Sequence, residues 1–224
     1  MSEGRTERKK ILKNVRNLLD DMESSKVTLI GDIMLDRYWH GAASRVSPEA
    51  PVPVVRVGSR EGRPGGAGNV ALNIAALGSA TRLIGVVGKD ETGDELHARL
   101  EAAGVFCDFL WSDDKPTITK LRVISQHQHL IRLDFEQPFE NKDLVGLFDK
   151  VKDLIDDSQV VVFSDYDKGA LTGIEQLIEL ARKRGKPIVI DPKGTDFQKY
   201  MGATIITPNL AEFESVVGAS KNEQ

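Results

Sequence analysis

The sequence is short of cysteine: Cys107 is its single cysteine in 224 residues. One cysteine cannot form a disulfide within the chain, which excludes the class of small secreted domains held together by disulfides. It fits a reducing compartment, so we expect a cytoplasmic protein. Cys107 lies in the apolar run Val105–Trp111, where a buried, unreactive thiol is a more frequent finding than a nucleophile.

Long hydrophobic runs and an excess of positive charge are absent as well. No apolar run approaches the roughly 20 residues that a membrane-spanning helix needs, and the N-terminal sequence lacks the apolar stretch of a secretory signal. The net charge of −4 at pH 7 argues against a dedicated nucleic-acid surface. We therefore expect a globular protein with neither a membrane nor a nucleic acid as partner.

Residues 1–26 predict an amphipathic helical extension. Between Arg5 and Ser24, apolar residues recur at helical spacing with charged residues between them. These residues are Ile11, Leu12, Val15, Leu18, Leu19 and Met22. Such a stripe packs on the body of a protein or on a partner, and the acidic stretch Asp20–Glu23 makes membrane binding the less favourable interpretation.

From residue 27 onward, short apolar strands alternate with helical patterns. The expected strands are Val27–Ile30, Arg82–Val87, Val160–Phe163, Ile188–Ile190 and Thr204–Ile206, and the expected helices are Ala67–Leu77, one capped by Asp94, Lys142–Ile155 and Gly173–Arg184. Strands without polar alternation, separated by helices, predict an α/β fold with a mostly parallel sheet between two helical layers. Ligands bind such sheets at the carboxyl ends of the strands.

Two segments, about 38–57 and 117–135, break this alternation. The first contains three prolines among valines, and the second reads as two β-rich segments with no crossover helix beside them. We expect these segments to form a small antiparallel sheet that stands off the main sheet and covers its ligand edge as a lid.

A glycine-rich segment, Arg63–Ala71, opens one of the predicted helices. Glycines let a ligand approach the backbone, and a helix N-terminus offers free N–H groups. Three interpretations stay open on this pattern alone: a tight turn, a sugar-binding loop, and a dinucleotide fingerprint, since residues 66–71 match G-x-G-x-x-A. The fingerprint belongs directly after a strand, and the polar, proline-ended segment Gly58–Pro64 disfavours it. A P-loop is excluded because no G-x-x-x-x-G-K-[ST] sequence occurs.

The context of this segment resembles the ribokinase/phosphofructokinase-B carbohydrate kinases. The resemblance rests on Val27–Trp39 followed by Gly65-Gly66-x-x-Asn69-Val70-Ala71. It narrows to the kinase half of the bacterial bifunctional heptose-7-phosphate kinase/ADP-heptose synthases through the blocks Arg45–Val55, Thr117–Val123, Leu130–Glu136, Ser164–Gly169 and Asp191–Gly194. The similarity covers about Val27 to Gly218, with Gly68 as a small departure from the alanine frequent in related kinases.

The resemblance implies a ribokinase-like fold and an ATP-dependent sugar kinase that uses Mg²⁺. The implied reaction transfers the γ-phosphate of ATP to the anomeric hydroxyl of D-glycero-D-manno-heptose 7-phosphate, giving the 1,7-bisphosphate for ADP-heptose and the lipopolysaccharide core. A homodimer formed through the β-lid is expected, because exposed edge strands pair readily. The alternatives are another sugar kinase of the same family, a dinucleotide-dependent oxidoreductase, and a non-catalytic sugar-phosphate-binding or dimerisation module.

Carried over residue by residue, the resemblance also implies a substrate site. The residues expected to hold sugar hydroxyls are Asp36, Gly65, Gly66 and Asn69, and those expected to bind the phosphate of the substrate are Lys120, Arg122 and Arg132. A turn or cap role is an equally good explanation of Asp36 taken alone, and a solvated strand face is the simpler explanation of any single cation. His127 and His129 lie in a polar turn and match no metal-binding pattern, so no role is predicted for them.

The nucleotide site is implied by the segment Thr207–Glu212, which resembles the N-x-x-E motif of the family. The residues expected near ATP are Asn209, Leu210, Ala211, Glu212, Lys193 and Lys168. Glu212 is expected to order Mg²⁺ through water, since Mg²⁺ keeps several waters and few carboxylate ligands. A capping box between Asn209 and Glu212 is the simpler explanation of the same spacing.

The family resemblance finally implies a later G-A-G-D segment, whose aspartate accepts the proton of the sugar hydroxyl. No such segment occurs, because Gly65–Gly68 is followed by Asn69, and Gly93-Asp94 lacks the preceding pattern. We therefore expect no catalytic residue within these residues. We also expect residues 27–224 to form a kinase domain whose C-terminal part is missing, with negligible activity of this chain alone.

Overall fold

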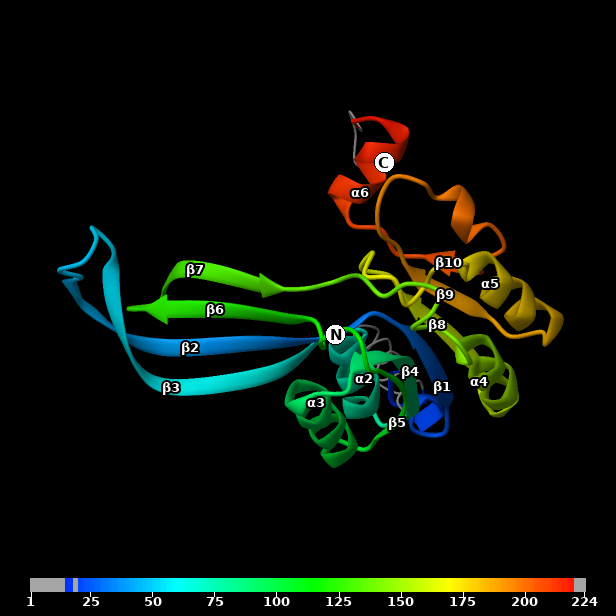
Figure 1. Ribbon diagram of the computed structural model, residues 1–224. Helices are drawn as coiled ribbons and strands as arrows, with labels where there is room; N and C mark the ends of the chain where they lie inside the picture. The colour runs from blue at the N-terminus through cyan, green and yellow to red at the C-terminus, as the bar shows by residue number, and fades with distance from the viewer. Residues whose placement is uncertain (1–14, 18–19, 220–224) are drawn as a thin grey trace, which may run out of the picture.

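The computed structural model describes residues 15–17 and 20–219, which form a six-stranded sheet flanked by helices and a separate four-stranded sheet that projects from it (Figure 1). The helix predicted for residues 5–24 lies largely outside the described residues. Of its predicted range, residues 15–17 and 20–23 are helical, and residues 20–23 lead into the first strand.

The six-stranded sheet has β1 (Lys26–Gly31) at its centre and every neighbouring pair parallel. The strand order is β10-β9-β8-β1-β4-β5, and the other bounds are β4 Ala80–Gly88, β5 Val105–Ser112, β8 Val160–Ser164, β9 Ile188–Asp191 and β10 Ile205–Ile206. The predicted parallel sheet is confirmed.

Strand β5 at its edge contains Cys107, which is half-buried. Burial, with the charges of Glu101 and Asp108, raises the pKa of this thiol to about 12, so it is not an activated nucleophile.

Helices cover both faces of this sheet, as the apolar strands predict. The helices are α2 (Ala67–Ala76), α3 (Glu91–Ala102), α4 (Leu147–Leu154), α5 (Ile174–Lys183) and α6 (Leu210–Val217), with 3₁₀ turns at Ile155–Asp157 and Gln198–Tyr200. Successive residues of β1 enter different cores: Leu29 packs with residues of α2 and α3, and Ile30 packs with residues of α4 and α5. Both are completely buried, and each such side chain contributes roughly 1.5–3 kcal/mol to folding. In α6, by contrast, no residue is buried.

The lid is the four-stranded sheet, in the order β3-β2-β6-β7. Its strands are β2 (Ile33–Val46), β3 (Pro53–Gly66), β6 (Thr119–Ser125) and β7 (Gln128–Phe135). Two predictions about it were wrong. The sheet is mixed rather than antiparallel, since β6 leaves the same end of the main sheet as β2 and runs parallel to it. The first lid segment also extends well beyond residues 38–57, because the pairing of β2 with β3 continues down to Ile33 and Gly66.

The glycine-rich segment lies at the junction between the end of β3 and the start of α2. A strand does run directly into α2, so the reason given against a dinucleotide fingerprint, the lack of a preceding strand, was wrong. The fingerprint nevertheless requires a βαβ unit of a parallel sheet. Strand β3 belongs to the lid and is antiparallel to β2, so the segment lies in a different structural context.

Helix α3 begins earlier than predicted and is capped by Asp90 rather than Asp94. The Asp90 carboxylate accepts hydrogen bonds from the backbone N of Gly93 (2.8 Å) and from the N and Oγ1 of Thr117 (2.8 and 2.7 Å). Asp94 lies in the first turn, where an acidic residue is favourable. Asp90 therefore ties the start of α3 to the segment that enters the lid.

We expect Asp90→Asn to lower the free energy of unfolding at neutral pH by roughly 1–3 kcal/mol, since it leaves buried donors poorly paired. Burial alone would raise the pKa of Asp90, but the hydrogen bonds from Thr117 and Gly93 outweigh it and hold the pKa below its ordinary value. A lowered pKa gives stability that is present above the unfolded value of 3.8 and is lost as the pH falls through the folded value. Urea unfolding at a series of acidic pH values should show a shallower loss of stability in the variant. An unchanged slope would contradict this assignment.

Candidate functional site

A cavity of about 410 Å³ lies where the lid meets the carboxyl end of β1. Its lining includes all of the residues predicted to bind substrate: Asp36, Gly65, Gly66, Asn69, Lys120, Arg122 and Arg132. They come from β2, β3, α2, β6 and β7, so segments far apart in the sequence meet here. The carboxyl end of the central strand is where ligands bind in parallel sheets.

The glycines of the cavity leave no room for a side chain. An ideal Cβ on Gly65 would lie 2.5 Å from Oδ2 of Asp36, and one on Gly66 would lie 2.4 Å from the backbone oxygen of Asp32. Gly66 has φ of +56° and immediately precedes α2. The Ala67 N–H donates to the Asp32 oxygen at 2.9 Å, which fixes the start of the helix. Because Gly65 and Gly66 have no side chain, a ligand in the cavity can contact their backbone directly.

Asp36 and Arg122 form the central ion pair of the cavity. The Asp36 Oδ1 accepts a hydrogen bond from Arg122 Nη1 at 2.6 Å, and the two side chains are 21% and 18% exposed. Tyr38 lies between two guanidinium groups, with Arg122 at 5.2 Å and Arg63 at 4.9 Å from its ring centroid. Burial alone would lower the pKa of Arg122, but Asp36 outweighs it and raises the pKa, so the guanidinium stays charged. An oriented guanidinium of this kind suits a phosphate.

The other cations lie at the base of the lid and are paired with carboxylates. Arg132 Nε is 2.9 Å from Asp134 Oδ1. Lys120 Nζ lies 3.6 Å from Glu136 Oε2, while Lys168 Nζ lies 3.0 Å from Glu136 Oε1. Lys168, predicted near ATP, thus shares a carboxylate with Lys120 of the substrate group. Its contact with ATP stays a prediction.

Apart from Lys168, the predicted nucleotide residues meet at the carboxyl ends of β9 and β10. Asn209 caps α6 by accepting from Glu212 N (3.0 Å), and Glu212 Oε2 accepts from Asn209 N (3.1 Å), so the capping box is present. The other oxygen of Glu212 is 3.1 Å from Lys193 Nζ. Leu210 and Ala211 are exposed beside them. The capping role does not exclude a nucleotide role, because Oε1 is directed at Lys193.

Acidic groups of the predicted substrate site and of the predicted nucleotide site both lie near Tyr166. Burial, and then the charges of Asp191, Asp36 and Glu212, raise the pKa of the Tyr166 phenol. Burial and Glu212 likewise raise the pKa of Asp191. A cation would reduce the repulsion between these carboxylates. Asp191 and Glu212 together suit Mg²⁺, which proteins bind through one or two carboxylates and several waters. Within the described residues no group of three or more His, Cys, Asp or Glu forms a ready-made metal cage.

Sequence reasoning missed several lining residues: Met34, Tyr38, Arg63, Pro64 and Tyr166. Tyr38 and Arg63 each lie two positions from a predicted residue on the same strand, so strand alternation identifies them once β2 and β3 are known to extend to the cavity. Tyr166 follows the end of β8, where ligand-binding residues are expected.

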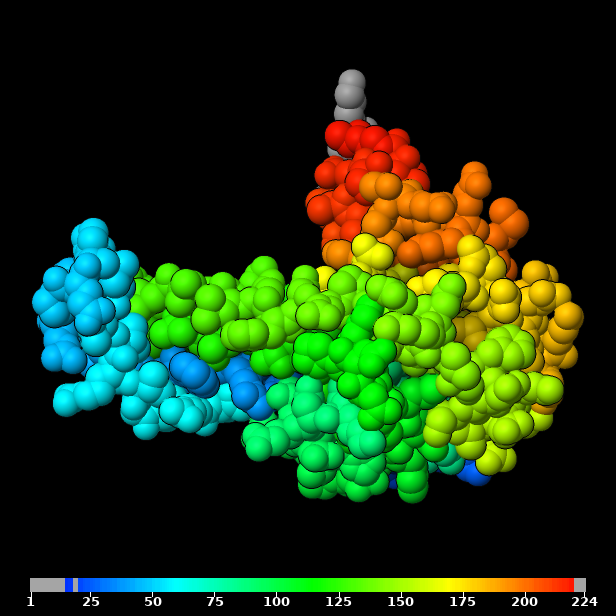
Figure 2. Space-filling view, viewed as in Figure 1, coloured from blue at the N-terminus to red at the C-terminus, as the bar shows by residue number. Residues whose placement is uncertain are grey.

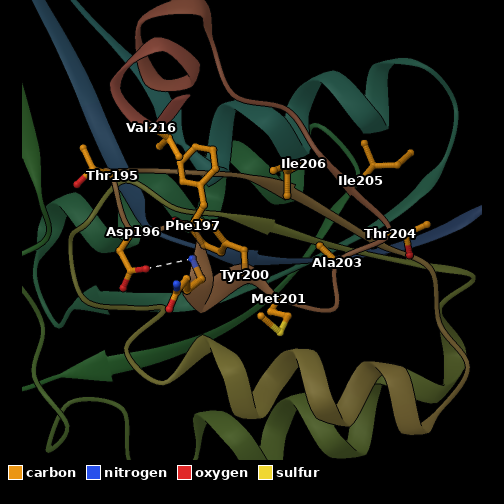
Figure 3. Close-up of a pocket in the computed structure, with 11 residues that line it drawn as sticks. Thr195, Asp196, Phe197, Tyr200, Met201, Ala203, Thr204, Ile205, Ile206 and Val216 are labelled. Atoms are coloured by element: carbon orange, nitrogen blue, oxygen red, sulfur yellow. Dashed lines mark hydrogen bonds between the residues drawn. The ribbon is translucent and has the colours of Figure 1, made fainter. Parts of the chain in front are cut away.

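A larger cavity, of about 640 Å³, lies elsewhere, between α6 and the segment 195–206 (Figure 3). Its walls are mainly apolar, with Phe197, Met201, Ile206 and Val216 among them, and Asp196 accepts a hydrogen bond from Gln198 N at 3.0 Å. None of the predicted site residues lines it. In the space-filling view α6, in red, projects from the body of the molecule above the base of the lid (Figure 2). Size alone therefore does not identify the site.

None of the helices in the described part of the chain is long and apolar enough to cross a membrane.

Comparison with known proteins gives the family. The pfkB family of carbohydrate kinases matches residues 24–224. Bifunctional protein HldE of Hahella chejuensis is 57% identical over 201 residues, which are 90% of this chain and 42% of that protein. HldE of Cronobacter sakazakii is 53% identical over 206 residues, which are 92% of this chain and 43% of that protein. The chain thus spans less than half the length of these relatives.

Solved structures agree on the fold. Phosphofructokinase-2 of Escherichia coli, in a tetrameric inhibited form, is 21% identical with a TM-score of 0.69, over 89% of this chain and 66% of that one. The ribokinase of Arabidopsis thaliana with ribose and ATP is 18% identical with a TM-score of 0.63, over 87% and 63%. The fold is thus ribokinase-like, as predicted, and the chain belongs to the pfkB family of carbohydrate kinases.

Proposed function

We propose that this chain forms the substrate-binding part of an ATP-dependent kinase that phosphorylates D-glycero-D-manno-heptose 7-phosphate at its anomeric hydroxyl, for ADP-heptose and lipopolysaccharide core synthesis in the cytoplasm. The observation that supports it is that one cavity is lined both by the residues expected to bind hydroxyls and by four cations, Arg63, Lys120, Arg122 and Arg132. A sugar needs the former, and a sugar that already carries a phosphate also needs the latter. The high identity to bifunctional HldE proteins supports the same substrate.

In this proposal the residues have separate tasks. The sugar hydroxyls are oriented by Asp36, Asn69 and the backbone of Gly65 and Gly66. The phosphate of the substrate is held by the cations of the cavity, mainly by Arg122. Holding the acceptor in one orientation lowers the entropic part of the barrier to phosphoryl transfer.

On the nucleotide side, Lys193 and Asn209 contact the phosphates of ATP, with Leu210 and Ala211 beside them. Glu212 orders Mg²⁺ through water, and the ion supplies neutralisation of charge on the transferring phosphoryl group. Asp191 adds a second carboxylate to this side.

The test is calorimetric titration of the chain with heptose 7-phosphate, with the same heptose lacking the phosphate, and with fructose 6-phosphate. We expect the first to bind and the unphosphorylated sugar to bind about 100-fold more weakly, since charged hydrogen bonds of roughly 3 kcal/mol are lost. Equal binding of both heptoses would overturn the assignment of the cations. Tighter binding of fructose 6-phosphate would favour another sugar kinase of the family, and protection from unfolding by NAD instead of ATP would favour an oxidoreductase.

The magnesium assignment predicts that Glu212→Gln weakens binding of the non-hydrolysable Mg-ATP analogue about tenfold, a loss of about 1.4 kcal/mol. Glutamine keeps an oxygen that accepts from Asn209 N, so the capping box survives while the charge is removed. Nucleotide titration with and without Mg²⁺ measures the effect. The loss should vanish without Mg²⁺. A loss of equal size without the ion would mean that Glu212 acts through its ion pair with Lys193 and not through Mg²⁺.

We also propose that two copies associate through their lids. Every residue of β7 is exposed, and Ile131, Leu133 and Phe135 place apolar side chains on one face of this edge strand. We expect Phe135→Glu to convert a dimer into a monomer in light scattering after size-exclusion chromatography. Phe106→Glu on β5 is the matched control, because Phe106 is 60% exposed and Phe135 54%. If both variants stay dimeric, the lid is not the interface.

A further inference from the structure

Asp32 is a completely buried carboxylate, 1% exposed, that lies just outside the cavity. Its Oδ2 accepts hydrogen bonds from the backbone N of Tyr166 (2.8 Å) and Lys168 (3.1 Å), and its Oδ1 accepts from Ala170 N (2.9 Å). Three backbone donors from one loop thus converge on one side chain. No other element donates to this carboxylate among the described residues.

The backbone of Asp32 holds two more segments. Its N–H donates to the oxygen of Ser164 at the end of β8 (3.2 Å), and its oxygen accepts from Ala67 N at the start of α2 (2.9 Å). The same oxygen lies against Gly66, where a Cβ would come within 2.4 Å of it. One residue therefore joins the end of β1, the sugar-side glycines and the loop 165–170.

That loop brings two polar groups to the substrate side. Tyr166 lines the cavity with Asp36 and Asn69. Lys168 reaches Glu136, which also faces Lys120. Asp167 has φ of +57°, and Gly169 has φ of +104° with a Cβ position only 2.1 Å from Phe139 O. Asp167 carries a backbone cost of about 1–2 kcal/mol in this conformation, whereas Gly169 carries none, and the bonds to Asp32 help to offset that cost.

We propose that Asp32 is a positioning residue for the sugar-phosphate pocket: it fixes Tyr166 and Lys168 against the Gly65-Gly66 segment. The inference rests on the proposed function of that pocket. Asp32 is 1% exposed and does not line the cavity, so it acts on the substrate only through the loop and the glycines that it holds.

Replacement by asparagine tests this with almost no change of shape. An amide has a single acceptor oxygen, so its NH₂ group must face either Ala170 N–H or the N–H groups of Tyr166 and Lys168. A donor placed against a donor leaves at least one buried N–H unpaired, and the loop shifts.

The matched control is Asp165→Asn in the same loop. Asp165 is also buried, at 5% exposed, but its Oδ2 accepts from Tyr200 Oη (2.6 Å) and Lys199 Nζ (2.9 Å). Tyr200 Oη in turn accepts from Lys193 N at 2.9 Å. Asp165 Oδ1 also accepts from Asp167 N within the loop (2.8 Å), and the amide oxygen of the Asp165→Asn variant can keep that bond. The variant therefore alters the contacts with Tyr200 and Lys199 on the nucleotide side, whereas Asp32→Asn alters the substrate side.

The experiment measures the dissociation constants of both variants for heptose 7-phosphate and for the Mg-ATP analogue, with backbone hydrogen exchange of the free proteins. We expect Asp32→Asn to weaken heptose 7-phosphate binding about tenfold or more, to change nucleotide binding less than about twofold, and to speed exchange in residues 165–170. Asp165→Asn should show the reverse preference between the two ligands.

Equal weakening of both ligands by Asp32→Asn would show a general structural role, and either unchanged heptose 7-phosphate binding or unchanged exchange would also overturn the proposal. If the unmodified chain itself does not bind heptose 7-phosphate, the proposed function fails. Exchange in residues 165–170 then still decides whether Asp32 positions this loop.

Discussion

Replacing Gly66 by alanine is expected to abolish detectable heptose 7-phosphate binding and to lower the free energy of unfolding by about 3 kcal/mol or more. Gly66 has φ of +56° and ψ of −134°, a region that is almost restricted to glycine. The added Cβ would also lie 2.4 Å from the backbone oxygen of Asp32. Backbone cannot rotate away as a side chain can, so β1 or α2 must move.

The matched control for this substitution is Gly104→Ala. Gly104 has φ of +82°, but no heavy atom lies within 4 Å of its Cβ position. It should therefore show only the backbone cost, about 1–2 kcal/mol, and unchanged binding. Urea unfolding and calorimetry of the two variants separate conformational strain from steric clash. Normal heptose 7-phosphate binding by Gly66→Ala would remove this glycine from the proposed site.

The centre of the main sheet could be predicted because its strands are buried on both faces. In β1, β4 and β8 this gives continuous β-branched and apolar runs between helical patterns, which few other folds produce. Strand β5 was not predicted as one. It is an edge strand, and its run includes Asp108, which pairs with Arg82, and the exposed Phe106. A mixed environment of this kind gives no clear period in the sequence.

Pairing direction in the lid was not predictable from local sequence. Nothing in residues 119–125 distinguishes a strand that pairs in parallel with β2 from one that pairs antiparallel; the direction follows from where the chain leaves β5. The assignment of Asp36, Gly65 and Arg122 to one site came from family resemblance, and the structure brings them together. The role of the loop 165–170 depends on a buried carboxylate some 130 positions earlier in the chain, a contact that no local pattern predicts.

We expect Arg122→Ala to weaken heptose 7-phosphate binding about 100-fold or more, which corresponds to about 2.7 kcal/mol. The substitution removes a cation from the cavity and also leaves Asp36 without its 2.6 Å partner. Arg132→Ala is the control, because Arg132 is 57% exposed, pairs with Asp134 and should matter only a few-fold. Calorimetric titration of both variants measures the difference.

A double-mutant cycle then separates the two functions of Arg122. If its main task is to orient Asp36, then Asp36→Asn and Arg122→Ala together should be little worse than the more damaging single substitution, because each already breaks the same pair. If Arg122 instead binds phosphate while Asp36 binds hydroxyls, the two losses should add. The unphosphorylated heptose decides between these cases independently, since only phosphate binding makes the Arg122→Ala effect depend on the phosphate. Similar losses for Arg122→Ala and Arg132→Ala would contradict the central place given to the Asp36–Arg122 pair.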